Sequence, residues 1–438
     1  MDHTPVAPER TDEADPRRPR LVALSAALVL VIVAAAGYAL TRPDNETPWQ
    51  RAGPPITVHG WAPYWQTDSA LESFSVNADL FSDISLFAYH TTESGAVSAY
   101  EGLGATVLET YRAAADAADV TLTASIIDDN PAGVTAAILA DPATRATHVE
   151  AIVQLAVAND FGGIDIDYEK FAFSDGRETW EATRPNWVAF IRELAAALHA
   201  LDKTLVVSVP PMYDPERTGG DRGYWVYDYA AMGEVVDFIR IMAYDYNTSE
   251  AGPIAPVEWV RGLVGDIKKM VPPSKLILGL PVYGYNWPVS ILGVCPVDQE
   301  PKRQNQSTKS AAALAASLAI TPTYDADVAE ATFSYNENLI GVDAAGAPTE
   351  CTVSRQVWYA DARAAYERAW LAERQDLAGI AIWSLGSDDA AVWEGIAAAR
   401  AEVESWPAAT ATDAPPTAPP TPTDAPPTAP ITAPTTAP

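Results

Sequence analysis

Short apolar segments recur along the central part of the chain, between about residues 54 and 403, with more polar stretches between them. They are rich in β-branched and aromatic residues, a composition that predicts strands. Several are continuously apolar, which is typical of a parallel sheet covered on both faces. The predicted strands are Ile56–Trp61, Ile84–Tyr89, Thr121–Ile127, Gly163–Tyr168, Thr204–Pro210, Phe238–Tyr244, Leu276–Tyr283 and Gly379–Leu385.

Helical patterns lie between these strands, for example at Trp187–Leu201 and Val257–Val271. Eight strands alternating with helices over roughly 350 residues favour an α/β fold of the (β/α)8 TIM barrel type over a doubly wound sheet. The interval Asn286–Arg355 is too long for a simple connection. We therefore expect a barrel at residues 54–403 with a small α+β insertion at about 287–355, between barrel strands seven and eight.

The N-terminal end has a different pattern. Residues 1–20 are polar, with three arginines near their end, and residues 21–40 carry no charge. At about 1.5 Å per residue, such a helix is long enough to cross a bilayer. By the positive-inside rule, we expect a cytoplasmic tail at 1–20, a transmembrane signal anchor at 21–40 and a linker at 41–53 that leads to an extracellular barrel. The alternative is a signal peptide cleaved near Ala34–Ala36, which would give a secreted protein.

The C-terminal segment 407–438 consists almost entirely of Pro, Thr, Ala and Asp, and the sequence TDAPPTAP occurs in it twice. Such a segment has little to bury and favours extended conformations, so we expect a disordered tail or stalk. A segment that spans or binds a cell wall is the alternative, and the threonines are potential O-glycosylation sites.

The two cysteines, Cys295 and Cys351, both lie in the expected insertion. In an exported chain, a pair of this kind favours a disulfide over a metal site. Two sulfurs without neighbouring histidines could not form a structural zinc site. We expect a disulfide here, and neither a metal nor a cofactor in the protein.

The charge of the chain excludes one class of partner. The sequence has 28 Lys and Arg against 58 Asp and Glu, a formal net charge of -30. Such a surface repels phosphate backbones, so nucleic acid is excluded as a partner. Residues 21–406 hold 24 of the basic and 51 of the acidic residues, so the acidity belongs to the core and its linker.

The strand at Gly163–Tyr168 carries the most informative chemistry. Because side chains alternate along a strand, Asp165, Asp167 and Glu169 point to one face. In a barrel this face is the interior, with Glu169 nearest the C-terminal mouth, where active sites form. Carboxyl groups this close cannot all ionise cheaply, so a retained proton and a general acid are expected. An exposed acidic strand and a divalent metal site are the alternatives.

Several strand segments together resemble one family. Residues 162–169 (GGIDIDYE) resemble the DGxDxDxE motif of glycoside hydrolase family 18, the chitinase-like family. Residues 241–245 resemble its MxYD motif, residues 278–287 its LGxPxYGxxW pattern, and residues 379–386 carry the expected tryptophan. Residues 60–65 and 357–362 are most similar to the bacterial branch that contains spore-cortex and cell-wall hydrolases.

The resemblance implies a substrate-assisted mechanism. Glu169 would protonate the glycosidic oxygen and later act as a base toward water, while the N-acetyl carbonyl of the substrate attacks the anomeric carbon. Asp167 would bind the acetamide nitrogen, with Asp165 beneath it. Tyr244 would donate to the acetamide oxygen, and Asp245 would support the same sugar.

The resemblance also implies sugar-binding residues, with Trp383 beneath the ring. The further expected substrate-binding residues are Met242, Tyr283, Trp61, Tyr64, Trp65 and Trp287. For the last four, ordinary packing is an equal alternative. Gly162 replaces the first Asp of the motif, which we expect to affect strand packing more than proton transfer, and Tyr168 replaces the commoner Trp on the outer face.

We therefore expect a retaining glycosidase for a β-linked N-acetylglucosamine polymer. Peptidoglycan is the first choice, because a membrane anchor would hold the barrel beside the wall, and chitin or its oligosaccharides are the second. The partners expected are this polysaccharide and the membrane, and the protein is expected to be a monomer. A catalytically silent carbohydrate-binding protein of the same fold is the alternative.

Overall fold

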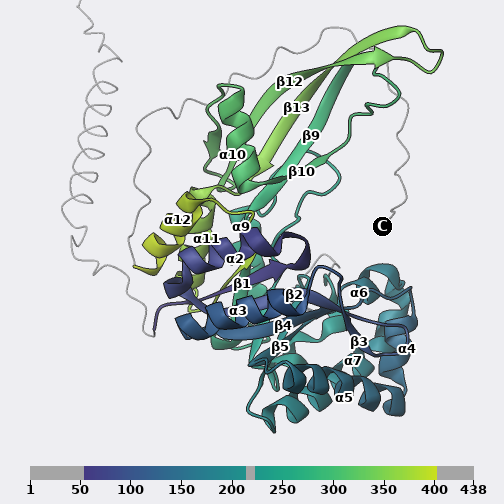
Figure 1. The fold of residues 1–438 in the computed structure, drawn as a ribbon, viewed down its shortest axis with the longest axis vertical. Helices are drawn as coiled ribbons and strands as arrows, with labels where there is room; N and C mark the ends of the chain where they lie inside the picture. The colour runs from purple at the N-terminus through teal and green to yellow at the C-terminus, as the bar shows by residue number, and fades with distance from the viewer. Residues whose placement is uncertain (1–53, 214–221, 402–438) are drawn as a thin grey trace, which may run out of the picture. The chain divides into compact units, whose positions relative to one another are not determined.

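The computed structural model describes residues 54–213 and 222–401, and Figure 1 shows their fold. Eight parallel strands form the barrel: β1 (Thr57–Pro63), β2 (Phe81–Thr91), β4 (Thr121–Ile127), β5 (Gly163–Asp167), β6 (Thr204–Val209), β7 (Phe238–Ile241), β8 (Leu276–Pro281) and β14 (Gly379–Trp383). Strand β1 pairs with both β2 and β14, which closes the sheet. The predicted TIM barrel is confirmed, and each predicted strand overlaps an observed one.

Helices surround the barrel, and β3 (Val97–Ala99) pairs antiparallel with the end of β2. The helices are α2 (Thr67–Val76), α3 (Ala105–Ala118), α4 (Val134–Ala140), α5 (Pro142–Ala158), α6 (Lys170–Ser174), α7 (Trp180–His199), α8 (Tyr229–Gly233), α9 (Val257–Ile267), α11 (Ala362–Arg374) and α12 (Ala390–Arg400). In α7, Trp187, Ile191 and Leu194 are fully buried in the main hydrophobic core, at the spacing that places them on one helix face. This helix begins seven residues before the predicted start and includes Pro185.

The barrel interior contains a buried cation. Arg240 on β7 is fully buried, and its guanidinium donates to Asp83 on β2 at 2.5 Å and to Asp165 on β5 at 3.0 Å. The same guanidinium lies 5.0 Å from the ring of Trp61 on β1 and 3.1 Å from His59 Nδ1. Arg240 therefore joins strands from different sides of the barrel and compensates two buried carboxylates.

An inserted antiparallel sheet lies between β8 and β14, as predicted. It consists of β9 (Tyr283–Gly293), β10 (Gln304–Ser307), β11 (Thr323–Asp325), β12 (Glu330–Val342) and β13 (Pro348–Tyr359), in the order β10-β9-β13-β12-β11. Helix α10 (Thr308–Ser317) packs beside this sheet (Figure 1). The sheet extends four residues beyond the expected bounds of 287–355 at each end. At its start, β9 begins two residues after β8 ends, and at its end β13 continues to Tyr359.

A disulfide joins Cys295 and Cys351, so this prediction is confirmed. Cys351 lies on β13 opposite Gly293 of β9, and Cys295 follows the end of β9. The bond therefore ties the loop that leaves β9 back to β13, the central strand of the inserted sheet.

The predicted membrane segment is not part of the described structure. Within residues 54–213 and 222–401, no helix combines the length and apolar character needed to cross a bilayer. The predicted tail at 1–20, anchor at 21–40, linker at 41–53 and tail at 407–438 lie outside the described residues.

Candidate active site

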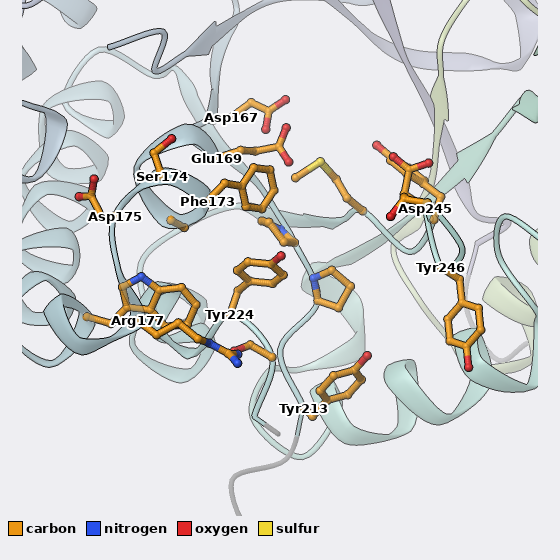
Figure 2. A pocket seen from close by; sticks show the side chains of 18 of the residues that line it. Asp167, Glu169, Phe173, Ser174, Asp175, Arg177, Tyr213, Tyr224, Asp245 and Tyr246 are labelled. Atoms are coloured by element: carbon orange, nitrogen blue, oxygen red, sulfur yellow. The ribbon is translucent and has the colours of Figure 1, made fainter. Parts of the chain in front are cut away.

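A cavity of about 1040 Å³ opens at the C-terminal mouth of the barrel. Six of the predicted site residues line it: Asp167, Glu169, Met242, Tyr244, Asp245 and Trp383. Figure 2 shows Asp167 and Glu169 at one end of the cavity, with Asp245 to their right and Tyr213 below. The structure thus brings together side chains at or just beyond the C-terminal ends of β5, β7 and β14, as expected for the active-site face of a barrel.

Strand β5 positions the three predicted carboxyl groups at different heights. Asp165 is fully buried inside the barrel, and Asp167 is the last residue of the strand. Glu169 lies just beyond the strand, as the residue that precedes helix α6. Tyr168 points the other way and is buried against Phe190 of α7, and its hydroxyl lies 2.8 Å from Nε2 of His148 on α5. The alternation predicted from the sequence therefore holds through the end of the strand.

Asp165 is saturated by hydrogen-bond donors. It accepts from Trp61 Nε1 at 2.8 Å, from Ser125 Oγ at 2.6 Å and from Ser208 Oγ at 2.6 Å, in addition to Arg240. These four donors, one of them the Arg240 cation, occupy both oxygens of Asp165. Of the three carboxyl groups of this segment, Asp167 and Glu169 are therefore the ones that can act on a ligand in the cavity.

Burial raises the pKa of Glu169 to about 8, and the carboxyl groups of Asp128 and Asp245 act in the same direction. Burial likewise raises the pKa of Asp167 well above its usual value, with further contributions from Glu169 and Asp165. Asp167 is 3% exposed, and its Oδ1 has no hydrogen-bond partner among the described residues. This pair can hold a proton at neutral pH, and Asp167 has one oxygen left for a ligand.

The cavity wall opposite Glu169 is built around Asp245, which follows β7. Its Oδ1 accepts from the hydroxyls of Tyr283 at 2.5 Å and Tyr285 at 2.6 Å, both on β9. Asp245 has a φ of 58°, a left-handed conformation that Asp tolerates. Tyr283 does not line the cavity, so it acts on the site through Asp245. Tyr285 was missed by sequence reasoning, although it stands two residues after Tyr283 on the same strand face.

Tyr244 reaches the cavity because of a glycine on the neighbouring strand. A Cβ atom at Gly279 would lie 2.9 Å from Tyr244 Cε1 and 2.7 Å from the Ile241 carbonyl oxygen, so only glycine leaves room for this ring. Burial raises the pKa of Tyr244 well above its usual value, and Asp167 and Glu169 add to the effect. The phenol therefore remains a hydrogen-bond donor at physiological pH.

Trp383 forms an aromatic wall of the cavity. Its ring makes edge contacts with Phe87 at 4.9 Å, Trp61 at 5.7 Å and Trp65 at 6.2 Å between centroids. The peptide bond between Trp383 and Ser384 is cis. Phe87, on β2, also lines the cavity and was missed by sequence reasoning.

Two predicted sugar platforms have a different role. Trp61 has no exposed surface and donates its indole N–H to Asp165, which favours the packing alternative given for it over stacking on a sugar. Trp287 is only 6% exposed and packs against Tyr285 beneath Arg303, which leaves almost no ring surface for a ligand. Tyr64 stacks on Tyr100 at 4.2 Å and does not line the cavity, whereas Trp65 is 55% exposed beside Trp383.

Other aromatic side chains that line the cavity were not identified from the sequence. They are Phe173, Trp180, Tyr213, Tyr224, Tyr246 and Trp259. Phe173 and Tyr224 meet edge to face at 5.3 Å, and Trp259 Nε1 donates to the Tyr213 hydroxyl at 3.0 Å. All six follow the C-terminal ends of β5, β6 or β7, and this position after a predicted strand was the available signal.

In the ranges 54–213 and 222–401, no group of three or more His, Cys, Asp or Glu side chains is arranged to hold a metal ion.

Gly162, which replaces the first Asp of the acidic motif, lies where a Cβ atom would be 2.7 Å from Thr121 Cγ2. The small residue at this position is therefore explained by packing between β4 and β5.

Comparisons with known proteins agree with this geometry. The chain is 24% identical over 261 residues to the protein named Uncharacterized glycosylase YvbX of Bacillus subtilis. This match covers 59% of this chain and 67% of that protein. It is 26% identical over 262 residues to the cortical fragment-lytic enzyme of Bacillus anthracis. This second match covers 58% of this chain and 53% of that enzyme. The chain thus matches between about half and two thirds of the length of these relatives.

A solved chitinase from Chromobacterium violaceum has the same fold, with a TM-score of 0.63 at 24% identity over 78% of this chain and 98% of that one. The profile described as Glycosyl hydrolases family 18 matches residues 61–388, from β1 to just beyond β14. This match includes the three carboxyl groups of the β5 segment, the Tyr244 and Asp245 wall and Trp383. The chain belongs to glycosyl hydrolases family 18.

Proposed function

We propose that this protein is a retaining glycosidase that cleaves β-linked N-acetylglucosamine polysaccharides with the help of the substrate's own acetamide group. The observation that carries the proposal is the pair formed by Glu169 and Asp167 in the cavity at the C-terminal mouth of the barrel. Glu169 keeps a proton at neutral pH, since its pKa is raised to about 8 by burial and by neighbouring carboxyl groups. Asp167 offers a buried oxygen that no described side chain occupies.

In the first step, Glu169 transfers its proton to the glycosidic oxygen while the acetamide carbonyl oxygen of the substrate attacks the anomeric carbon. The bond between the anomeric carbon and the leaving oxygen breaks, and an oxazolinium ion forms. Asp167 accepts a hydrogen bond from the acetamide nitrogen and stabilises the positive charge. In the second step, Glu169 takes a proton from water, the water oxygen attacks the anomeric carbon, and the acetamide is restored with net retention.

The carboxyl groups of the cavity support assistance by the substrate over a protein nucleophile. Four described carboxyl groups line the cavity: Asp167, Glu169, Asp175 and Asp245. Asp245 is held by two phenol hydroxyls, and Asp175 accepts the backbone N–H of Gly133 at 2.7 Å. Hydrogen bonds to a carboxylate oxygen lower the nucleophilicity of Asp245 and Asp175. The raised pKa of Asp167 favours its neutral carboxyl group, which is a poor nucleophile, and this leaves the acetamide as the attacking group.

The remaining side chains provide the sugar contacts in this proposal. Tyr244 donates to the acetamide oxygen, Asp245 accepts from hydroxyls of the same sugar, and Trp383 lies beneath its ring. Trp65 extends the platform, because it is exposed and close to Trp383. Met242 lines the cavity beside them.

Peptidoglycan is the substrate that we propose first, and chitin or its oligosaccharides second. One relative, named a cortical fragment-lytic enzyme, supports the first choice. The strong negative charge of the core opposes binding of an anionic wall polymer at long range. The aromatic cavity walls compensate, since stacking against sugar rings does not depend on charge.

We further propose that the barrel works outside the cell. A disulfide between Cys295 and Cys351 is typical of an oxidising compartment. A tether at residues 21–40 would hold the barrel beside the wall, with residues 1–20 on the cytoplasmic side. Fractionation of cells that produce the full chain tests this location.

Product analysis tests the function. We expect the protein to release fragments that end in N-acetylglucosamine from purified peptidoglycan and, more slowly, from chitin oligosaccharides, as measured by mass spectrometry. The first product seen by NMR should be the β-anomer, because retention requires two inversions at the anomeric carbon.

The outcomes of this experiment separate the alternatives. Release from chitin alone would leave the glycosidase and replace the proposed substrate. Binding of the oligosaccharides without release from either polymer would favour a catalytically silent carbohydrate-binding protein.

A further inference from the structure

Asp128 is a buried carboxyl group that sequence reasoning did not identify and that the mechanism above does not use. It directly follows β4, whose last residue, Ile127, pairs in register with Asp167 of β5. Asp128 is 2% exposed, and it does not line the cavity. A buried carboxylate must be satisfied by hydrogen bonds, so its partners indicate what it does.

Both oxygens of Asp128 bind the start of helix α6. Oδ1 accepts the backbone N–H of Lys170 at 2.8 Å, and Oδ2 accepts that of Phe171 at 2.7 Å. These are the first two residues of α6, and Glu169 is the residue in front of them. The side chain at this position normally caps the free N–H groups of the first turn. Glu169 makes no such capping bond within the described chain, because Asp128 satisfies those groups from the neighbouring strand.

The backbone on the other side of Glu169 is also fixed. The hydroxyl of Tyr227 donates to the carbonyl oxygen of Tyr168 at 2.7 Å, and the ring of Tyr168 is held by His148. Glu169 therefore lies between two fixed backbone groups, the carbonyl of Tyr168 and the N–H of Lys170. Its carboxyl group lines the cavity.

We propose that Asp128 is a positioning residue that fixes Glu169 through the first turn of α6 and sets the pH range over which Glu169 can donate a proton. This inference rests on the proposed role of Glu169 as the acid. Asp128 takes over the capping of α6. Burial raises the pKa of Asp128 itself to about 7, so its carboxyl group is ionised over the pH range in which Glu169 loses its proton.

The charges around Glu169 favour this role for Asp128. Several titratable groups surround the carboxyl of Glu169. They are Asp128 after β4, Asp167 at the end of β5, Tyr227 after β6, and Tyr244 and Asp245 after β7. The ammonium group of Lys170 is directed away, to Asp129 at 2.7 Å. Arg240 acts on Asp167 from below. After burial, Asp128 makes the largest contribution to the raised pKa of Glu169.

The test is the substitution Asp128→Asn, with Asp129→Asn as its matched control. Asparagine keeps the shape of Asp128 and can accept one of the two N–H groups, but it removes the charge. Asp129 is the next residue, partly exposed, and paired with Lys170 and the Tyr100 hydroxyl. Both variants replace an acidic residue of the same loop, so they differ in burial and in contact with the backbone of α6.

Removal of the Asp128 charge makes ionisation of Glu169 easier, so the proton on Glu169 is lost at lower pH. We expect the alkaline limb of kcat/KM in Asp128→Asn to move down by about one pH unit. At the optimum we expect a loss of about tenfold in kcat with little change in KM, because the acid is less well placed. In Asp129→Asn, the alkaline limb should stay at the pH of the wild type, and kcat should lie within about twofold of the wild-type value.

A second readout does not depend on turnover. The carboxyl of Glu169 can be titrated by ¹³C NMR in the full chain labelled at its glutamates, with Glu169→Gln to assign the signal. We expect its midpoint to move down in Asp128→Asn and to stay in place in Asp129→Asn. An unchanged midpoint in Asp128→Asn overturns the proposal. If the titration midpoint of Glu169 shifts but the wild-type protein cleaves neither polymer, the effect of Asp128 on Glu169 is supported and the proposed hydrolysis is rejected.

If Asp128→Asn does not fold, as judged by its thermal unfolding, Asp128→Ser is the second variant. Serine can cap a first turn but carries no charge. The midpoint of Glu169 should fall in this variant as well, and an unchanged midpoint would contradict the proposal in the same way.

Discussion

Glu169→Gln is expected to lower kcat on N-acetylglucosamine polymers by about 10³-fold or more. The amide has nearly the same shape as the carboxyl group, but it cannot give a proton to the glycosidic oxygen or take one from water. Binding should persist, because Asp167, Tyr244 and Trp383 still contact the sugar. Product release by mass spectrometry gives the rate, and calorimetry with a chitin oligosaccharide gives the affinity.

Glu178→Gln is the matched control for this variant. Glu178 is exposed, lies nine residues after Glu169 and does not line the cavity, so its rate should stay within about twofold of the wild type. A Glu169→Gln protein that keeps more than about a tenth of the wild-type rate would rule out Glu169 as the acid. The wild-type rate should itself decline above about pH 8, as Glu169 loses its proton.

Arg240→Met is expected to destabilise the folded barrel by about 3–5 kcal/mol. Methionine has a similar length and is apolar, but it leaves Asp83 and Asp165 buried without their cation. Burial alone would raise the pKa of Asp83, yet the charge of Arg240 and hydrogen bonds from His59 and Thr123 hold it well below its usual value. Urea unfolding followed by tryptophan fluorescence measures the loss.

Arg261→Met provides the comparison, because Arg261 forms an exposed ion pair with Glu258 on α9. It should cost no more than about 0.5 kcal/mol. Because the folded pKa of Asp83 is lowered, its ion pair stabilises the protein fully above about pH 4 and less as the pH falls through the folded pKa. The difference between wild type and Arg240→Met should therefore shrink in acid. A cost below about 1 kcal/mol at pH 7 would show that Arg240 is not needed to compensate the carboxylates.

The strands of the barrel could be predicted from the sequence because burial on both faces leaves a strong apolar signal. Thr204–Val209 and Leu276–Pro281 are almost continuously apolar, and both were found within one or two residues. The insertion was recognised from an interval that was too long, but its start was placed at Trp287 and not at Tyr283. The chain remains strand-like across the junction of β8 and β9, so no change of pattern marks the boundary.

The site could be predicted only where alternation along a strand decides it. Asp165 and Asp167 follow from β5 alone, whereas the depth of a tryptophan inside the barrel depends on its neighbours across the lumen. Trp61 and Trp383 both point inward, 5.7 Å apart, yet only Trp383 reaches the cavity. Asp128 was missed for a related reason, since its partners lie 42 and 43 residues later in the chain.

The buried cation also constrains the order in which the chain can fold. Asp83 and Asp165 belong to β2 and β5, and Arg240 follows Asp165 by 75 residues. A ribosome-bound chain that has released only five strands cannot bury these carboxylates cheaply, because their counter-charge has not yet been synthesised. We therefore expect the interior of the incomplete barrel to stay hydrated until β7 is synthesised. Only then can water leave the interior, because Arg240 pairs with both carboxylates.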